Sequence, residues 1–273
     1  MYLITGSKGQ LGTELSKILP EAILTDADSL DITDEVAVAE FVKNHQIDTI
    51  INCAAFTAVD KAEDDYELAA KININGPTNL AKTGAKIVHI STDYVFDGHA
   101  YKPYTTDDIT APVSVYGKTK LAGEQSVINN AQCAIIIRTA WLYSSYGNNF
   151  VKIMRKLGAE KDQINVVCDQ IGSPTYAADL AQAIKNILPQ MTQNNSGIYH
   201  YTNEGVCSWY DFATEIMSLS DLNCKVNPIP SSAYPTKASR PHYSVLDKSK
   251  IKTTFNLNIP HWKTSLIKCL EKL

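Results

Sequence analysis

Short apolar runs alternate along the chain with longer segments in which apolar residues recur at helical spacing. The first run, Tyr2–Thr5, breaks into a glycine-rich turn, after which Leu11, Leu15 and Ile18 recur three or four residues apart. This order predicts a strand, a tight turn and a helix. The same alternation continues downstream, with strands expected at 22–25, 49–53, 87–91 and 134–138, and helices at 36–42, 68–82, 118–128 and 177–188.

Short strands separated by helices are typical of a parallel sheet that is covered on both faces. We therefore predict an α/β protein with a Rossmann-type doubly wound parallel sheet and a smaller, interleaved C-terminal substrate lobe. The pattern becomes less regular after Tyr143, and proline and tyrosine become more frequent toward the C-terminus. Residues 1–143 are expected to form a dinucleotide-binding domain, completed by about 164–190, and residues 144–163 and 191–273 the substrate-binding lobe.

Composition narrows the classes of function. The chain has 273 residues, of which 44% are hydrophobic and 20% charged, and a formal net charge of -4. It offers no basic surface for nucleic acid and no apolar run of the roughly 18 residues that a membrane span needs. The six cysteines are scattered singly, which argues against a structural zinc site. Met1 leads directly into an apolar strand without an export signal, so we expect a cytoplasmic protein.

The first turn has the residues of a pyrophosphate-binding loop. Gly6, Gly9 and Gly12 lie between the first strand and the first helix, where they permit a tight turn and a close approach of a phosphate to the helix N-terminus. Asp26 ends the second apolar run twenty residues after Gly6, at a position where a carboxylate binds the adenosine ribose. Alternatively, Asp26 is an ordinary loop acid.

The candidate reaction chemistry lies at the start of the helix expected at 118–128. Tyr116 and Lys120 are four residues apart, so a helix places both side chains on one face. A phenol has an ordinary pKa of about 10, and a nearby cation lowers it toward the working range of an acid catalyst. The alternative is a surface aromatic residue beside a lysine, without a role in catalysis.

Other candidates follow the expected strands, where ligands of parallel sheets bind. Thr92 and Asp93 come directly after the strand at 87–91, and Trp141 comes after the strand at 134–138. Arg240 lies in the segment Ala-Ser-Arg-Pro at 238–241 of the second lobe. We expect Arg240 to meet a phosphate, although a solvated surface arginine is an equally acceptable interpretation.

Three motifs in this order resemble the extended short-chain dehydrogenase/reductase family: Gly-x-x-Gly-x-x-Gly at 6–12, Ser-Thr-Asp-Tyr-Val-Phe at 91–96 and Tyr-Gly-Lys-Thr-Lys at 116–120. Within that family, the segments 52–63, 138–143, 147–150, 169–175 and 238–241 resemble the dTDP-4-dehydrorhamnose reductases. The resemblance implies reduction of the C4 ketone of dTDP-4-dehydro-L-rhamnose by NADPH or NADH, for cell-surface polysaccharide. The implied partner is therefore a small nucleotide sugar.

The resemblance also assigns roles to residues. Tyr116 donates a proton to the developing oxyanion, Lys120 holds the nicotinamide ribose and lowers the Tyr116 pKa, and Thr92 hydrogen-bonds the same oxygen. The implied substrate contacts are Thr92, Asp93, Trp141 and Arg240. The implied cofactor contacts are Gly6, Gly9, Gln10, Leu11, Gly12, Asp26, Asp31, Ile32, Ala55, Phe56, Thr57, Tyr116 and Lys120.

Some members of the family form a dimer bridged by magnesium, through one carboxylate matched by Glu14 and others late in the helix that ends near Leu188. The segment 190–195 offers no carboxylate here, which argues against magnesium while leaving a homodimer open. Two other functions also remain open. One is a reductase or epimerase of another nucleotide sugar, and the other is a non-catalytic relative that regulates methionine adenosyltransferase.

Overall fold

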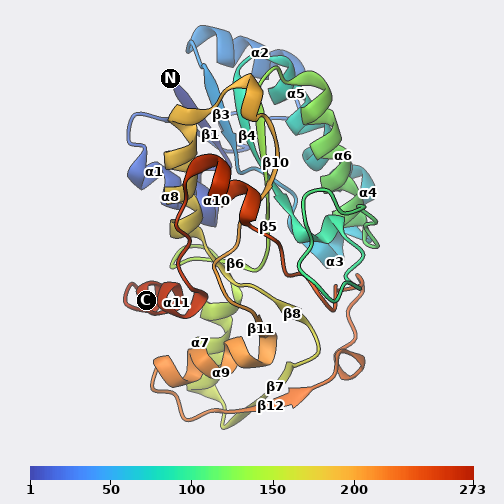
Figure 1. Ribbon diagram of the computed structural model, residues 1–273, viewed down its shortest axis with the longest axis vertical. Helices are drawn as coiled ribbons and strands as arrows, with labels where there is room; N and C mark the ends of the chain where they lie inside the picture. Colours follow the sequence, from blue (N-terminus) through green and yellow to red (C-terminus); the bar gives the residue numbers. More distant parts are fainter.

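A six-stranded parallel sheet forms the centre of the computed structural model, which describes residues 1–273 (Figure 1). Its strand order is β10-β5-β4-β3-β1-β2. The strands are β1 (Tyr2–Thr5), β2 (Ile23–Thr25), β3 (Thr49–Asn52), β4 (Lys86–Thr92), β5 (Ala134–Thr139) and β10 (Gly197–His200). Because β2 and β3 lie on opposite sides of β1, the chain changes direction there, which is where doubly wound sheets bind ligands.

Alternating side chains of the strands build two separate cores, as the period of a strand requires. Leu3 and Ile50 pack against α2, α5 and α6 on one face, whereas Ile4 and Ile51 pack against α1, α8 and α10 on the other (Figure 1). The helices are α1 (Gln10–Ile18), α2 (Glu35–Asn44), α5 (Gly76–Lys82), α6 (Val115–Asn130), α8 (Ala177–Ile187) and α10 (Ser249–Phe255). This layered arrangement confirms the predicted fold class.

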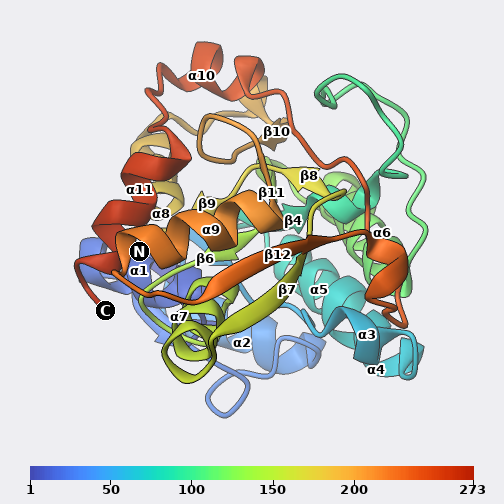
Figure 2. The same ribbon diagram turned by 90° about the horizontal axis from the view of Figure 1, so that it is seen from below.

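A smaller lobe faces the carboxyl ends of the strands. It has its own core and is built from α7 (Phe150–Glu160), β7 (Gln163–Val167), α9 (Trp209–Leu219), β12 (Lys225–Ile229) and α11 (Trp262–Leu270). Figure 2 shows β7 and β12 side by side beneath α9, and the two strands pair in parallel. Two short pairs complete the lobe region: β6 (Leu142–Tyr143) with β9 (Thr175–Tyr176), and β8 (Ile171–Gly172) with β11 (Cys207–Ser208).

The strand pairing differs from the expected segment boundaries at two places. β7 was expected near the dinucleotide-binding domain but pairs with β12, and β10 was expected in the lobe but pairs with β5. Both strands are short, and their partners lie about 60 residues away in the sequence. Local sequence patterns therefore do not show which sheet each strand joins.

The helix expected at 68–82 is also interrupted. The chain forms the short helices α3 (Val59–Ala62) and α4 (Tyr66–Ala70), and then a π-helical turn at Lys71–Asn75 leads into α5. Within that turn, the buried Asn73 donates hydrogen bonds to the Phe56 carbonyl and to the Thr119 hydroxyl. A π-turn at such a position is often associated with a functional site.

None of the helices combines the length and the apolar character that crossing a membrane requires.

Candidate functional site

A cavity of about 1420 Å³ lies between the carboxyl ends of the central strands and the lobe. It is larger than the 300–1,000 Å³ typical of a site for one small molecule, so it has room for two ligands. Nearly all of the residues expected at the site line it: Gly6, Gly9, Gln10, Leu11, Gly12, Asp26, Asp31, Ile32, Ala55, Thr57, Thr92, Asp93, Tyr116, Lys120, Trp141 and Arg240.

Phe56 is the exception, since it does not line the cavity. Its side chain packs against the small apolar cluster that contains Tyr116, and its backbone N–H and C=O both bond the Asn73 side chain. The Phe56 side chain therefore lies outside the cavity wall, and the contact of Phe56 with the cofactor stays a prediction. The Phe56 ring packs against the cluster that contains Tyr116. This packing stabilises the position of Tyr116, because it removes apolar surface from water.

The glycine turn leaves no room for side chains where the first strand meets α1. Gly6 has a φ of +67°, and a Cβ there would lie 2.7 Å from the Ala54 backbone nitrogen. A Cβ on Gly12 would lie 2.3 Å from the Gly6 carbonyl oxygen. The N-cap of α1 is Gly9, which supplies no side-chain hydrogen bond to the first turn. The backbone N–H groups at this helix start are therefore suited to an anion.

Asp26 ends β2 beside this turn. Its Oδ2 atom accepts hydrogen bonds from the Ser7 hydroxyl at 2.6 Å and from the Lys8 backbone N–H at 2.9 Å. The Lys8 ammonium extends to Asp28 at 2.6 Å, and both of those side chains are largely exposed. The turn is thus held to the end of β2 by the Asp26 carboxylate and by the Ser7 backbone N–H, which donates to the Thr25 carbonyl at 3.1 Å. The Lys8 cation lies near it.

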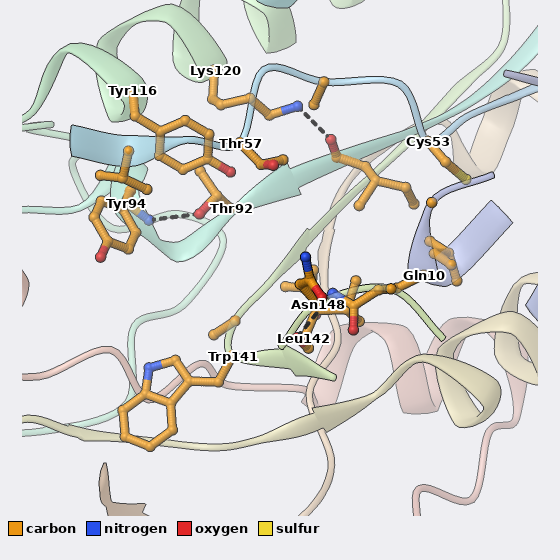
Figure 3. A pocket seen from close by; sticks show the side chains of 18 of the residues that line it. Gln10, Cys53, Thr57, Thr92, Tyr94, Tyr116, Lys120, Trp141, Leu142 and Asn148 are labelled. Atoms are coloured by element: carbon orange, nitrogen blue, oxygen red, sulfur yellow. Dashed lines mark hydrogen bonds between the residues drawn. The ribbon is translucent and has the colours of Figure 1, made fainter. Parts of the chain in front are cut away.

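Tyr116 and Lys120 lie on α6, where the expected helical spacing places them together. Ser114 caps this helix by accepting a hydrogen bond from Gly117 N–H at 3.1 Å, which fixes its first turn. The Lys120 ammonium donates to the Ile90 carbonyl at 2.7 Å. Figure 3 shows the Tyr116 hydroxyl directed toward Thr57 and Thr92, with the Trp141 indole across the pocket.

Burial controls the acidity of this pair. It raises the pKa of Tyr116 far above the ordinary value of a phenol, and the Thr92 hydroxyl acts in the opposite direction. It lowers the pKa of Lys120 to about 8, against the attraction of Glu124. The expectation that the Tyr116 pKa is lowered is not met in this structure, because removing the phenolate from water dominates and the charges of Asp93 and Tyr94 add to the rise. Tyr116 is therefore protonated at neutral pH.

Asp93 is a second unusual acid at the site. Its side chain is 4% exposed, its Oδ1 accepts a hydrogen bond from Thr92 at 3.0 Å, and its Oδ2 has no hydrogen-bond partner. Burial raises the pKa of Asp93 to about 7, although the Thr92 hydroxyl opposes this shift. Asp93 also lines the cavity, so its side chain lies at the edge of the proposed site.

Trp141 is held in an uncommon backbone conformation just after β5. Its φ is +49°, which is rare for a bulky residue. Its indole stacks on Trp209 of α9 with ring centroids 3.5 Å apart. The Phe150 ring packs against Trp209 as well, with centroids 4.6 Å apart. These three side chains line one wall of the cavity. They provide a flat apolar surface of the kind that sugar and base rings pack against.

Arg240 is not free for a ligand in this structure. Its Nη2 atom donates to Asp60 Oδ2 at 2.5 Å, and its Nη1 atom donates to the Tyr94 hydroxyl at 3.4 Å. Asp60 lies on α3, so the contact joins the dinucleotide-binding half to the lobe. All three side chains line the cavity.

Glu14, the expected counterpart of a magnesium ligand, points into the protein. Its side chain is buried and accepts a hydrogen bond from the Ser144 hydroxyl at 2.6 Å. The structure contains no group of three or more His, Cys, Asp or Glu side chains arranged to hold a metal ion.

Trp209 and Asp60 were missed by the sequence interpretation. The start of α9 does carry a sequence signal, because Ser208 and Asp211 form a capping box there. That signal predicts a helix with Trp209 at its first position, but no local pattern places this indole against Trp141. Asp60 lies on the short helix α3, after the mostly apolar residues 53–59, and carries no signal beyond its charge.

Comparisons with known proteins agree with this geometry. Residues 1–273 match the family model described as "RmlD substrate binding domain". The spore coat polysaccharide biosynthesis protein SpsK of Bacillus subtilis (strain 168) is 41% identical over 278 residues, covering 99% of this chain and 96% of that protein.

Two solved structures are similar along their whole length. A dTDP-4-dehydrorhamnose reductase from Clostridium acetobutylicum ATCC 824 has a TM-score of 0.95 and 46% identity, covering 99% of this chain and 98% of that one. The dTDP-4-dehydrorhamnose reductase of Bacillus anthracis str. Ames, in complex with NADP, has a TM-score of 0.95 and 41% identity, covering 100% and 99%.

Proposed function

Because the chain belongs to the dTDP-4-dehydrorhamnose reductase family, we propose that it reduces the C4 ketone of dTDP-4-dehydro-L-rhamnose to give dTDP-L-rhamnose. The observation that carries this proposal is the convergence of Thr92, Tyr116 and Lys120 in one cavity that also has a dinucleotide-binding turn. The product is a sugar donor for polysaccharide, as the name of the B. subtilis relative suggests for that protein.

The proposed cofactor is NADPH or NADH, which supplies a hydride to the C4 carbon when bound. The cradle of Gly6 and Gly12, which no Cβ can enter, and the uncapped start of α1 fit a pyrophosphate. Asp26 fits an adenosine ribose hydroxyl, and Lys120 fits the ribose near the nicotinamide. The remaining proposed contacts are Gly9, Gln10, Leu11, Asp31, Ile32, Ala55 and Thr57, which all line the cavity.

Tyr116 is the proposed proton donor. As a hydride adds to C4, the C=O π electrons move to oxygen, and the Tyr116 hydroxyl transfers its proton to that oxygen. The high pKa of the buried phenol keeps this proton in place until the oxyanion develops. The Thr92 hydroxyl, which donates to Asp93 in this structure, turns to the same oxygen as a second donor, and two donors there favour the transition state over the ketone.

The substrate lies, in this proposal, between Thr92 and the lobe. Trp141 and Trp209 form the apolar wall beside the deoxysugar, and Asp93 hydrogen-bonds a sugar hydroxyl. Arg240 binds the diphosphate after its ion pair with Asp60 has broken. Contacts at the sugar and at the diphosphate together hold C4 toward the nicotinamide. This orientation matters because even a small misplacement of the reacting atoms lowers the rate.

Both proposed ligands are small cytoplasmic metabolites, so we place the enzyme in the cytoplasm with a nucleotide sugar as its partner. Assembly into a homodimer stays a proposal that light scattering can test. Because Glu14 is buried and accepts a hydrogen bond from Ser144, we propose that no metal bridges such a dimer, so EDTA should not change the measured mass.

Turnover with the proposed substrate is the decisive test. Purified protein is mixed with NADPH or NADH and dTDP-4-dehydro-L-rhamnose, the loss of reduced-cofactor absorbance is followed, and mass spectrometry identifies dTDP-L-rhamnose. A UDP-linked 4-keto sugar serves as the matched control and should react much more slowly. If the protein binds both ligands but gives no product, the proposed reaction is wrong and a regulatory role gains support.

A further inference from the structure

Helix α6 presents three ionisable side chains on one buried face. Tyr116, Lys120 and Glu124 follow one another at intervals of four residues, and they expose 9%, 2% and 1% of their surfaces. The first two line the cavity, whereas Glu124 does not. A buried carboxylate is strongly disfavoured unless charged or polar partners surround it. The partners of Glu124 therefore indicate what it does.

Glu124 is bound from two strands at once. The Arg138 guanidinium on β5 donates Nε to Oε1 at 2.9 Å and Nη2 to Oε2 at 2.7 Å. The Ser91 hydroxyl on β4 donates to Oε1 as well. Bidentate pairing of this kind fixes direction as well as distance. Glu124 thereby ties α6 to β4 immediately before Thr92, and to β5 shortly before Trp141.

We infer that Glu124 is a positioning residue for the proposed reduction, on which this inference rests: it keeps the Lys120 side chain charged and aligned with the strand that carries Thr92. It contacts neither ligand in the proposed site and acts through Lys120. Because the two residues are one helical turn apart, the carboxylate faces the lysine from the same side of α6.

The other titratable groups around Lys120 carry no negative charge at neutral pH, so Glu124 is the anion that acts on it. Tyr116 on α6 and Cys53 after β3 both stay protonated at neutral pH, since burial raises the Tyr116 pKa and raises that of Cys53 to about 12. His89 on β4 stays neutral, because burial and Lys120 both lower its pKa. Arg138 on β5 is the counter-charge of Glu124.

The sign of the effect follows from these groups. Burial favours the neutral amine of Lys120 and Glu124 favours the ammonium, with a resulting pKa of about 8. Replacing the carboxylate by an amide removes the favourable charge, so the Lys120 pKa falls further. An opposite charge at close range typically shifts a pKa by about 1–3 units. Activity that depends on the ammonium is then lost at a lower pH than in the wild type.

The test compares Glu124→Gln with the double variant Glu124→Gln/Arg138→Gln, which removes both charges and avoids an unpaired buried guanidinium. The control is Asp179→Asn, since Asp179 is a partly buried carboxylate bound by Asn203 in another part of the protein. The pH profile of kcat/KM is measured for each. In parallel, the pKa of Lys120 is measured in the cofactor-free protein by competitive acetylation with peptide mass spectrometry.

The expected result is that the alkaline limb of kcat/KM and the acetylation pKa of Lys120 both move down by about 1 unit or more in Glu124→Gln. The shift should be smaller in the double variant, because removing the Arg138 cation offsets part of the lost negative charge. Asp179→Asn should move neither. Folded Glu124 variants with a wild-type limb and a wild-type Lys120 pKa would overturn the inference. Acetylation needs no turnover, so a wild-type protein without reductase activity would count against the proposed function alone.

Discussion

The indole rings of Trp141 and Trp209 stack with centroids 3.5 Å apart and planes inclined by 10°. One ring follows β5 of the central sheet, and the other begins α9 of the lobe, so the pair joins the two halves of the molecule along one wall of the cavity. The positive φ of Trp141 costs roughly 1–3 kcal/mol, and an aromatic pair contributes about 0.5–1.5 kcal/mol beyond its buried area. The unusual backbone is retained because it places the indole at the cavity wall.

Replacing Trp141 or Trp209 by alanine should therefore weaken binding of the nucleotide sugar by about tenfold, the equivalent of one lost aromatic contact. The affinity for NADH should hardly change, because both residues lie on the substrate side of the proposed site. Calorimetry with each ligand alone gives the two dissociation constants, and Tyr101→Ala, on an exposed loop, is the control. A variant that loses dinucleotide binding and keeps sugar binding would place the pair in the wrong half of the site.

Tyr116→Phe keeps the ring and removes the proton donor. We expect turnover to fall by roughly 10²- to 10⁴-fold, the usual contribution of a positioned general acid, with cofactor binding unchanged. Single-turnover kinetics with saturating NADPH separates the chemical step from binding. If this variant turned over at the wild-type rate, another group would have to deliver the proton.

The chain order of strands and helices, the glycine turn and the Tyr116–Lys120 pair could be predicted because each depends on residues close in the sequence. The Asp60–Arg240 contact joins residues 180 positions apart, and the Trp141–Trp209 stack depends on packing between the two halves. Neither leaves a local pattern. The Tyr116 pKa was expected in the wrong direction because spacing shows the nearby cation, whereas the depth of burial is known only from the fold.

Asp26 should influence the choice of cofactor. Its carboxylate accepts hydrogen bonds from a ribose 2′-hydroxyl and repels a 2′-phosphate, so NADH should be used well, with NADPH tolerated through the nearby Lys8. Asp26→Ala should raise the NADPH-to-NADH ratio of kcat/KM, and Lys8→Ala should lower it. Steady-state kinetics with both cofactors measures these ratios. A strong NADPH preference that Asp26→Ala leaves unchanged would show that this carboxylate does not face the ribose.

Asp93 should make the protein less stable as the pH rises. Its pKa is about 7 in the folded protein against an ordinary value of 3.8, so between these values the folded state binds more protons than the unfolded state. The free energy of unfolding then falls with rising pH across this window, by up to about 4 kcal/mol for this group. Asp93→Asn mimics the protonated acid and should lose less stability between pH 5 and pH 8.

Urea unfolding at pH 5 and pH 8 measures this difference, and Asp107→Asn, at an exposed position, serves as the control. Equal pH dependence in the wild type and Asp93→Asn would mean that Asp93 is ionised in the folded protein at pH 5.

Arg240 has to leave Asp60 before it can bind a diphosphate, because the two side chains form an ion pair at 2.5 Å within the cavity. Arg240→Ala should weaken binding of dTDP by about 10- to 100-fold, as expected for losing hydrogen bonds between charged groups. Asp60→Asn should instead tighten dTDP binding, since the guanidinium no longer has a competing carboxylate.

The neighbouring Lys237–Asp64 pair is largely exposed, which makes Lys237→Ala the matched control. Calorimetric titration with dTDP at low and high salt measures all three, and the effect of Arg240→Ala should shrink as salt screens the charges. Unchanged dTDP affinity in Arg240→Ala would leave Arg240 as a residue that only fastens the lobe to α3.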